Sequence, residues 1–348
     1  MNTIRVGIVG VSGYGGGEAA RLLAGHPHVE LTYVTSGTYA GRPLEAALPG
    51  LRGTGLTCQE YDSAAAIGQC DVLVLAGEAG LAMRLAPALL EADKRIVDLS
   101  ADFRLRSADE YAHWYGKTHT APHLLAEAAY GLPELNRAEI RAARLVANPG
   151  CYPTAAALAL APLLAAGRVD PTTLIVDSLS GVSGAGRAGF SLDYHFAEVN
   201  ESARAYGVGG THRHTPEMEQ TLAGVAGRPV TLTFTPHLIP ITRGILSTAY
   251  ATLTGTGGDG LHDLYQDYYK TAPFVAVLDD GQMPATKHTQ GTNNCHIGLA
   301  VDARTGRVVA ISVIDNLVKG AAGQAVQNLN LMCGFGETAG LTAGAVWP

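Results

Sequence analysis

Cysteines, long apolar runs and basic clusters are scarce in this sequence, and each shortage excludes a class of protein. The 348 residues include 5 cysteines without paired spacing, so we expect reduced thiols rather than a disulfide framework. Without a Cys-x-x-Cys pattern we expect no metal site. The most apolar run, residues 155–166, is too short to span a bilayer. The sequence opens without a secretory signal pattern, and we expect a cytoplasmic protein that binds no membrane.

Charge and composition narrow the function further. Lys and Arg number 24 against 31 Asp and Glu, a formal net charge of −7, which argues against a nucleic acid partner. A small anionic substrate would then need local Arg or Lys residues in its pocket. Hydrophobic residues make up 47% and glycines number 43, as is typical of an α/β enzyme with tight turns. The length predicts two domains.

A glycine-rich turn, GVSGYGGGE, follows the first expected strand, residues 4–9. A helix and a second strand, residues 29–34, come next. This βαβ order favours a nucleotide phosphate bound at the helix N-terminus. The spacing Gly10-x-x-Gly13-x-x-Gly16 differs from the usual dinucleotide pattern, so a turn without a ligand is the alternative.

The end of the second strand indicates which dinucleotide binds. An NAD site usually has Asp or Glu there for the ribose 2′-hydroxyl. This sequence has Thr35-Ser36-Gly37-Thr38, with Arg42 shortly after. Hydroxyl groups and a cation suit a 2′-phosphate, so we predict NADP(H); a plain loop is the alternative. Further strands at 72–76 and 95–99 extend the sheet, and Arg104 follows the second of them, placed either to bind an anion or to pair with Asp102 at the surface.

The residues around Cys151 are typical of a reactive thiol. Asn148-Pro149-Gly150 is a turn between a strand ending at Ala147 and an Ala/Leu-rich helix, residues 154–166, with Pro153 suited to its first turn. The thiol therefore lies just ahead of a helix N-terminus, whose partial positive charge stabilises a thiolate. A small buried cysteine is the alternative.

In the second half, His212 and His214 precede a helix in which we expect Thr215 as N-cap and Pro216 at the first position. A thiol enzyme needs a proton acceptor, usually His, although a loop histidine is the commoner case. Arg187 ends a run of small residues, either as an anion binder or as part of a plain loop.

The strands expected in the second half, residues 174–179, 229–236, 244–253, 294–302 and 307–314, predict a mixed, largely antiparallel sheet. We expect helices on one face of this sheet and room for a second subunit on the other. A last helix, residues 321–332, is expected to return to the nucleotide domain.

Eight stretches spread over nearly the whole chain match one enzyme family: residues 10–18, 98–104, 130–134, 148–154, 180–187, 212–217, 240–244 and 315–327. On these, the chain resembles the N-acetyl-γ-glutamyl-phosphate reductases of arginine biosynthesis and, in fold, aspartate-semialdehyde and glyceraldehyde-phosphate dehydrogenases. The resemblance implies an α/β fold with a Rossmann-type NADP-binding domain, residues 1–149 completed by about 320–348. It implies a catalytic and oligomerisation domain of α+β type over residues 150–319.

The resemblance also implies roles for single residues. Cys151 is the nucleophile that carries the acyl group as a thioester, and His212 is the general acid and base. The activity is NADPH-dependent reduction of an acyl phosphate, carried out by a homodimer or homotetramer. The implied cofactor contacts are Gly10, Ser12, Gly13, Tyr14, Gly15, Gly16, Thr35, Ser36, Ser183, Gly184 and Asn316. The implied substrate contacts are Arg104, Asn148, Arg187, His214 and Lys319.

Two positions depart from the family pattern. Many members have Pro-His where this chain has Glu78-Ala79, and many have Lys where it has Leu179, which leaves detailed cofactor contacts and one pocket-wall contact open. Reductases of aminoadipyl or aspartyl phosphate share the chemistry, but Asn-Pro before Gly150-Cys151 and Tyr-Pro after it favour the arginine pathway. The glycine turn argues against a cofactor-free cysteine hydrolase, and the position of Cys151 against a non-catalytic NADP-binding regulator.

Overall fold

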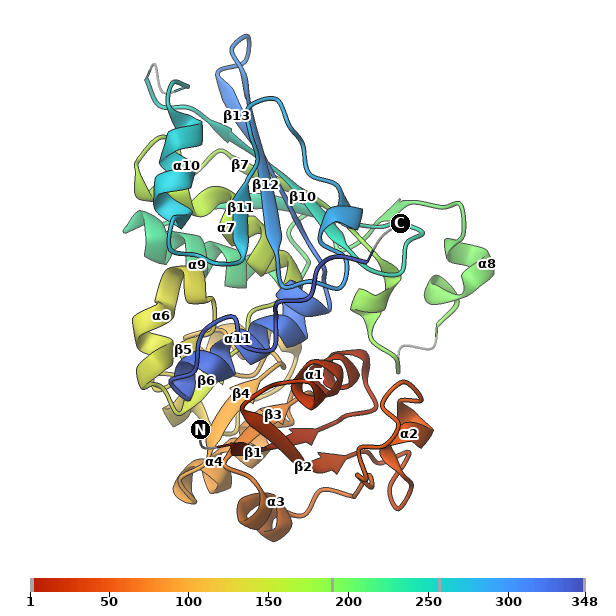
Figure 1. The fold of residues 1–348 in the computed structure, drawn as a ribbon. Coiled ribbons are helices and arrows are strands. Elements are labelled where there is room, and N and C mark those ends of the chain that lie inside the picture. The colour runs from red at the N-terminus through yellow and green to blue at the C-terminus, as the bar shows by residue number, and fades with distance from the viewer. Residues whose placement is uncertain (1–2, 189–190, 256–257, 347–348) are drawn as a thin grey trace. The chain divides into compact units, whose positions relative to one another are not determined.

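The chain forms two compact units (Figure 1). The computed structural model describes residues 3–188, 191–255 and 258–346. The first unit comprises Met1–Pro149, Gly186–Ala188 and Ala321–Ala343, and the second comprises Gly150–Ala185, Gly189–Gly320 and Gly344–Pro348. Among the described residues, no helix combines the length and apolar character that crossing a membrane requires.

The first unit is built on a parallel sheet. Its described strands run in the order β2 (Val29–Thr35), β1 (Ile4–Val9), β3 (Val72–Leu75), β4 (Arg95–Asp98), β6 (Leu145–Ala147) and β5 (Ala129–Tyr130). These strands are short and mostly buried because helices cover both faces. Figure 1 shows α1 (Tyr14–Ala24) and α11 (Gly323–Met332) on one face, and α3 (Ser63–Gln69) and α4 (Ala82–Glu91) on the other.

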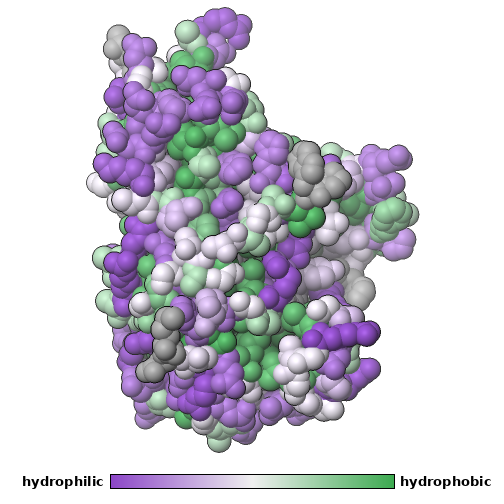
Figure 2. Space-filling view, in the orientation of Figure 1, coloured by the Kyte–Doolittle hydropathy of each residue, from purple (hydrophilic) through white to green (hydrophobic). Residues whose placement is uncertain are grey.

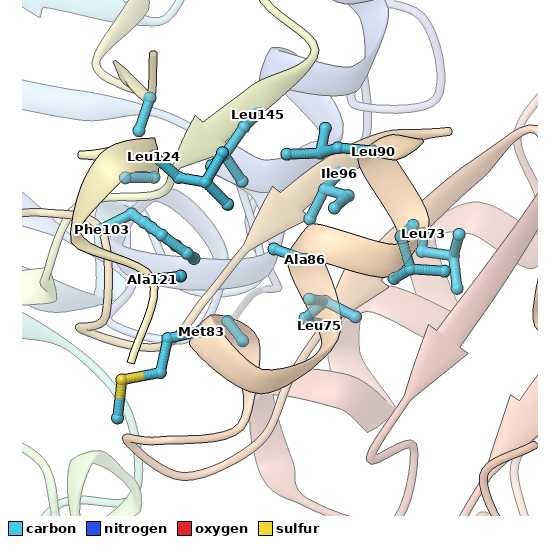
Figure 3. Close-up of a cluster of buried hydrophobic side chains, with 14 of the residues drawn as sticks. Leu73, Leu75, Met83, Ala86, Leu90, Ile96, Phe103, Ala121, Leu124 and Leu145 are labelled. Carbon is cyan, nitrogen blue, oxygen red and sulfur yellow. The ribbon is translucent and has the colours of Figure 1, made fainter. Parts of the chain in front are cut away.

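Buried side chains between the sheet and α4 make the core of this unit (Figure 3). Leu73, Leu75 and Ile96 from the strands meet Ala86 and Leu90 from α4. The segment between β4 and β6 contributes too, through α5 (Ala108–Tyr115) and η1 (Pro122–Leu124), whereas α6 (Pro133–Ala142) packs against α11. Its aromatic residues pack inside the unit, since Tyr111 is fully buried and stacks on Tyr115.

The strand order of the first sheet reverses between β1 and β3. From β1 the chain passes to β2 on one side and then to β3 on the other. In open parallel sheets, ligands bind at the carboxyl ends of strands where the order reverses in this way. The Gly10 turn follows β1 at this edge, so the position of the turn agrees with a dinucleotide site.

The second unit contains the mixed sheet that the sequence predicted. Its described strands run in the order β11 (Val275–Val277), β12 (Cys295–Asp302), β13 (Arg307–Ile314), β10 (Ile245–Thr252), β7 (Leu174–Ser180), β9 (Leu232–Leu238) and β8 (Arg204–Ala205). The β11–β12 and β7–β9 pairs are parallel, and the other described neighbours are antiparallel. The predicted fold class is therefore confirmed.

A buried helix, α7 (Cys151–Ala165), packs on this sheet against β10 and β13 and also contacts α9 (Thr215–Ala226) and α10 (Leu261–Tyr269). Residues from Tyr152 to Leu164 are buried all round the helix, which explains the lack of an apolar stripe in its sequence. Along β10, Ile245, Ser247 and Ala249 are buried, whereas the alternate residues are half-buried. The sheet thus has one helix-covered face and one more open face.

Two predicted helix starts were wrong by a few residues. Helix α7 begins at Cys151 rather than at residue 154, because Gly150 is already the extended N-cap and Pro153 fits within the first turn. Helix α9 has His214 rather than Thr215 at its N-cap, which puts Pro216 second in the helix. The first correction moves the thiol from a position ahead of the helix into its first turn.

Candidate active site

A pocket of about 410 Å³ in the second unit contains the predicted nucleophile. Cys151 lines it together with His212 and His214, and Gly184 contributes to the wall. The polar residues of the lining that sequence reasoning did not single out are Ser180, Asp193, Tyr194, Arg204, Tyr206 and Arg213. The structure therefore brings the thiol and both predicted imidazoles together in one cavity.

The start of α7 fixes the thiol in place. Gly150 is the N-cap, and its backbone N–H donates to Oε1 of Glu217 at 2.8 Å. Glu217 is fully buried in α9, so this bond ties the two helices together. Cys151 follows as the first helical residue and is half-buried. A thiolate at this position is stabilised by the helix dipole.

A short π-helix, η5 (Val318–Ala322), lies directly against Cys151. A Cβ added to Gly320 would be 2.8 Å from Cβ of Cys151, so only glycine fits there. The carboxylate of Asp315 shapes the turn by accepting from the backbone N–H groups of Leu317 and Val318. Single π turns are frequent at functional sites, and this one closes the space beside the thiol.

The hydrogen bonding of His212 fixes its tautomer. The backbone N–H of His214 donates to Nδ1 of His212 at 3.1 Å, so the neutral ring carries its proton on Nε2. Rings of Tyr152, Tyr206 and Phe234 surround it, with centroids 5.2–5.6 Å away. Burial and, less strongly, the charge of Arg213 lower the pKa of His212 to about 4. At neutral pH the ring is therefore an uncharged Nε2–H donor.

The Gly10 turn in the first unit suits a bound pyrophosphate in its backbone conformation and its place before a helix. Gly10 has φ +89°, and a Cβ there would come within 2.6 Å of the carbonyl oxygen of Ala76. Its N–H donates to Oγ1 of Thr35 at 3.2 Å. Gly13 caps α1, which then begins with Tyr14, Gly15 and Gly16. The loop therefore presents backbone at a helix N-terminus, the usual place for a phosphate.

Hydroxyl and guanidinium groups gather at the end of β2. Oγ of Ser36 donates to Oγ of Ser12 at 2.8 Å. Arg187 donates to the carbonyl oxygen of Ser12 at 3.1 Å and to the hydroxyl of Tyr39 at 3.3 Å, and Arg42 lies 5.5 Å from the centre of the Tyr39 ring. This donor set fits a 2′-phosphate, since it holds cations and hydroxyls but no carboxylate. The structure thus groups Arg187, a predicted substrate contact, with the cofactor loop.

Arg104 is buried in the first unit, so its alternative reading as a surface residue is wrong. It is 8% exposed, and it donates from Nε to the carbonyl oxygen of Asn148 and from Nη2 to that of Leu99, both at 2.8 Å. Asn148 in turn donates to the carbonyl oxygen of Ala321 at 3.1 Å. Asp102, the expected surface partner, is buried. It accepts from the backbone N–H groups of Gly80 and Met83 and from the hydroxyl of Tyr111.

The other predicted contacts lie in the second unit, outside the described pocket lining. Asn316 donates to Oγ of Ser183 at 3.0 Å and accepts from the N–H of Gly244 at 2.8 Å, which holds the 181–185 turn against the neighbouring strand. Lys319 is fully buried, with Nζ 5.8 Å from the centre of the Phe274 ring. Leu179 pairs with Leu246 and lies on the face of β7 opposite to Ser180, so this departure from the family pattern does not alter the pocket wall.

Sequence reasoning missed residues that only the tertiary fold brings to the pocket. Asp193 and Arg204 come from a segment without helical or strand periodicity, and nothing in its sequence pointed to the thiol. Glu217 belongs to the matching stretch 212–217, but its spacing from the two histidines gave no sign of the bond to Gly150. Among residues 3–188, 191–255 and 258–346, no group of three His, Cys, Asp or Glu side chains could hold a metal ion.

The comparisons with known proteins agree with this arrangement. Residues 5–143 match the family described as semialdehyde dehydrogenase, NAD binding domain, and residues 151–316 match semialdehyde dehydrogenase, dimerisation domain. A protein of Symbiobacterium thermophilum named N-acetyl-gamma-glutamyl-phosphate reductase is 56% identical over 348 residues, 99% of this chain and 100% of that protein. The equally named protein of Desulforudis audaxviator is 53% identical over 349 residues, with coverage of 99% and 100%.

Solved structures share the fold at low sequence identity. Aspartate semialdehyde dehydrogenase II of Vibrio cholerae has a TM-score of 0.73 at 19% identity, over 96% of this chain and 99% of that chain. Aspartate semialdehyde dehydrogenase of Candida albicans, solved with NADP, has a TM-score of 0.72 at 15% identity, over 95% and 99%. By its full-length similarity to the curated relatives, the chain belongs to the N-acetyl-gamma-glutamyl-phosphate reductase family of semialdehyde dehydrogenases.

Proposed function

We propose that this enzyme reduces N-acetyl-γ-glutamyl phosphate to N-acetylglutamate semialdehyde with NADPH, releasing phosphate in a reversible step of arginine biosynthesis. The observation that carries the proposal is Cys151 in the first turn of α7, sharing one pocket with the neutral donor His212. The names of the curated relatives support the substrate. The matched dimerisation domain supports a homo-oligomer, either a dimer or a tetramer, and reduced thiols suit the cytoplasm.

In the first half of the reaction, the Cys151 thiolate attacks the acyl carbon of the substrate. A carbon–sulfur bond forms, the carbon–oxygen bond to phosphate breaks, and phosphate leaves with the electron pair. The start of α7 stabilises the thiolate before attack. Splitting one difficult reduction into acyl transfer and thioester reduction is the advantage of a covalent route. Arg104 is our proposed ligand of the leaving phosphate.

In the second half, bound NADPH supplies the hydride that reduces the thioester carbon. The residues proposed to hold it in the first unit are Gly10, Ser12, Gly13, Tyr14, Gly15, Gly16, Thr35 and Ser36, with Arg187 beside them, and those in the second unit are Ser183, Gly184 and Asn316. Nε2–H of His212 donates to the substrate oxygen as negative charge develops on it. The oxyanion then collapses to the aldehyde and returns the thiolate of Cys151.

This scheme changes the role expected of His212. In the reductive direction the thiol needs no base, since thiolate enters the cycle and thiolate leaves it, and the one proton consumed overall is taken up from solvent by the departing phosphate. The tautomer of His212 leaves Nε2 with a hydrogen to donate rather than a lone pair to accept a proton. We therefore assign His212 to oxyanion stabilisation rather than to deprotonation of the thiol.

The test is phosphate-dependent reduction of NADP⁺ with N-acetylglutamate semialdehyde, set beside aspartate semialdehyde. We expect turnover with the first substrate, tighter binding of NADPH than of NADH, and no turnover by Cys151→Ser although NADPH still binds in a fluorescence titration. Turnover retained by the Ser variant would rule out the thioester route. A preference for aspartate semialdehyde would contradict the proposed substrate, and tighter binding of NADH than of NADPH would contradict the proposed cofactor.

A further inference from the structure

One wall of the Cys151 pocket comes from a segment to which the mechanism gives no task. It includes η3 (Leu192–Tyr194), α8 (Phe196–Val199) and β8. Leu192 and Phe196 are each 77% exposed, and Figure 2 shows hydrophobic residues at the surface of the projection where Figure 1 labels α8. Asp193 and Arg204, by contrast, line the pocket. The segment therefore has an outer side in solvent and an inner side that faces the reacting thiol.

The sheet fixes the backbone of Arg204. β8 pairs antiparallel with β9, with Arg204 opposite Leu238 and Ala205 opposite His237. The N–H of Tyr206 then donates to the carbonyl oxygen of Pro236 at 3.0 Å. Tyr206 itself bonds through its hydroxyl to that of Tyr152, 2.8 Å away, next to Cys151. A guanidinium group is thus anchored to the same framework that holds the nucleophile.

Arg204 already holds a carboxylate in this structure. Its Nη1 donates to Oδ1 of Asp193 at 2.6 Å, and its Nη2 donates to the carbonyl oxygen of the same residue at 2.9 Å. The two side chains remain 43% and 64% exposed, and exposed ion pairs contribute little to stability. A planar guanidinium is suited to binding a carboxylate through two parallel hydrogen bonds. The pair is therefore a carboxylate receptor whose present occupant can be displaced at small cost.

The substrate of the proposed function has a matching group. Once its phosphate has left, the acyl chain on Cys151 has one remaining charge, the α-carboxylate, and neither the thiol nor His212 binds it. We propose that Arg204 binds this α-carboxylate, and that Asp193 holds the guanidinium in the pocket until the substrate displaces it. The inference rests on the proposed function, because it takes that substrate's carboxylate as the ligand.

Exchange of partners predicts opposite effects for the two residues. Arg204→Gln removes the receptor and leaves Asp193 to repel the substrate, so the KM for N-acetylglutamate semialdehyde should rise about 10- to 100-fold, as expected for loss of a charged hydrogen bond. Asp193→Asn removes the competing acceptor, so its KM should equal or fall below that of the wild type. Arg204→Lys keeps the positive charge but loses the planar guanidinium that forms two parallel hydrogen bonds, so its KM should lie between those of the wild type and Arg204→Gln.

The experiment measures KM for the semialdehyde and for inorganic phosphate in the NADP⁺-reduction assay. Arg228→Gln is the matched control, an exposed arginine of the same unit outside the described pocket lining. A second substrate replaces the carboxylate by a carboxamide. We expect wild type to discriminate strongly between the two substrates and Arg204→Gln to lose that discrimination, while KM for phosphate and the melting temperature stay unchanged.

The outcomes separate this inference from the proposed function. No turnover of N-acetylglutamate semialdehyde by the wild type overturns both. Wild-type turnover with an unchanged KM in Arg204→Gln, or with equal losses for the acid and the amide, overturns the assignment of Arg204 alone. A rise confined to the KM for phosphate shows that Arg204 binds the other anion and likewise overturns it. An Asp193→Asn variant that loses affinity as Arg204→Gln does contradicts the exchange.

Discussion

At the scale of single residues, the tautomer of His212 decides what chemistry the pocket offers. The backbone N–H that occupies Nδ1 is part of the turn into α9 and cannot rotate away. The aromatic surroundings keep the ring uncharged by making solvation of the imidazolium poor. An imidazole with a hydrogen on Nε2 and a pKa far below neutrality is a hydrogen-bond donor without a positive charge, a known way to polarise a carbonyl oxygen.

This leads to a prediction about pH. Since the pKa of His212 is about 4, the pH profile of kcat/KM should show no ionisation of this residue between about pH 6 and 8, where an ordinary histidine titrates. ¹⁵N NMR of the imidazole should show Nε2 protonated and Nδ1 bare. His212→Ala should lower kcat about 10²- to 10³-fold, the usual cost of losing one oxyanion donor. If the wild-type pH profile instead shows an inflection near pH 6.5 that is absent from His212→Ala, His212 acts as a general base.

The same shift affects stability, and its sign follows from linkage. The folded state lowers the pKa of His212 below its value of 6.5 in the unfolded chain, so between the two values the unfolded chain binds more protons. The contribution of His212 is therefore fully present above about pH 6.5 and is lost as the pH falls toward 4. In His212→Ala, acid unfolding should be correspondingly less steep in this window.

At the scale of elements, α9 supports the start of α7. Glu217 of α9 accepts from the N–H of Gly150, and it is a positioning residue because it acts on the reaction through the thiol's neighbour. Glu217→Ala should lower kcat about 10- to 100-fold, the size of effect that a misplaced reacting group produces. Leaving a buried donor unsatisfied should also cost about 1–3 kcal/mol of stability. Glu217→Gln keeps an acceptor oxygen, so it should retain most of the wild-type kcat and most of the stability.

Glu219, on the same helix, provides the matched control. Its Oε1 also accepts a backbone N–H, from Leu232 at 3.0 Å, but that bond holds β9 rather than Cys151. Glu219→Ala should therefore lower the melting temperature while leaving kcat within about twofold of the wild type. Equal losses of kcat in both alanine variants would show that Glu217 acts only through global stability.

The elements were predictable where local signals agreed with the fold. The Asn-Pro-Gly turn and an apolar run predicted a strand, a turn and α7 around Cys151, and long β-rich stretches predicted the strands of the second sheet. The exact start of α7 was not predictable, because it depends on a carboxylate from α9 that is 67 residues away. The segment carrying Asp193 and Arg204 has short elements and no periodicity; tertiary contacts, the pairing of β8 with β9 and the bonds between Arg204 and Asp193, hold it at the pocket.

At the scale of the whole molecule, the open face of the second sheet is the surface on which we expect the subunits to assemble. Opposite α7, apolar side chains form cross-strand rows: Leu179, Leu246 and Val313 in one, and Ile175, Tyr250 and Val309 in another. Most of these residues are only half-buried in the single chain. They lie within the matched dimerisation domain, and a broad apolar face of this kind is normally covered by a partner.

We therefore expect a second copy of the chain to pack on this face. Tyr250→Asp would place a charge on this apolar face without disturbing the helix-covered side, and burying it unpaired under a partner would be costly. Light scattering after gel filtration should show the wild type as a dimer or tetramer and the variant as a smaller species that keeps its fold by circular dichroism. Val301→Asp is the control. Val301 is 42% exposed and shares a face of the sheet with its register partner Val308, which is buried on the helix-covered side, away from the proposed interface. This variant should leave the assembly intact. If Tyr250→Asp assembles like the wild type, another surface forms the oligomer.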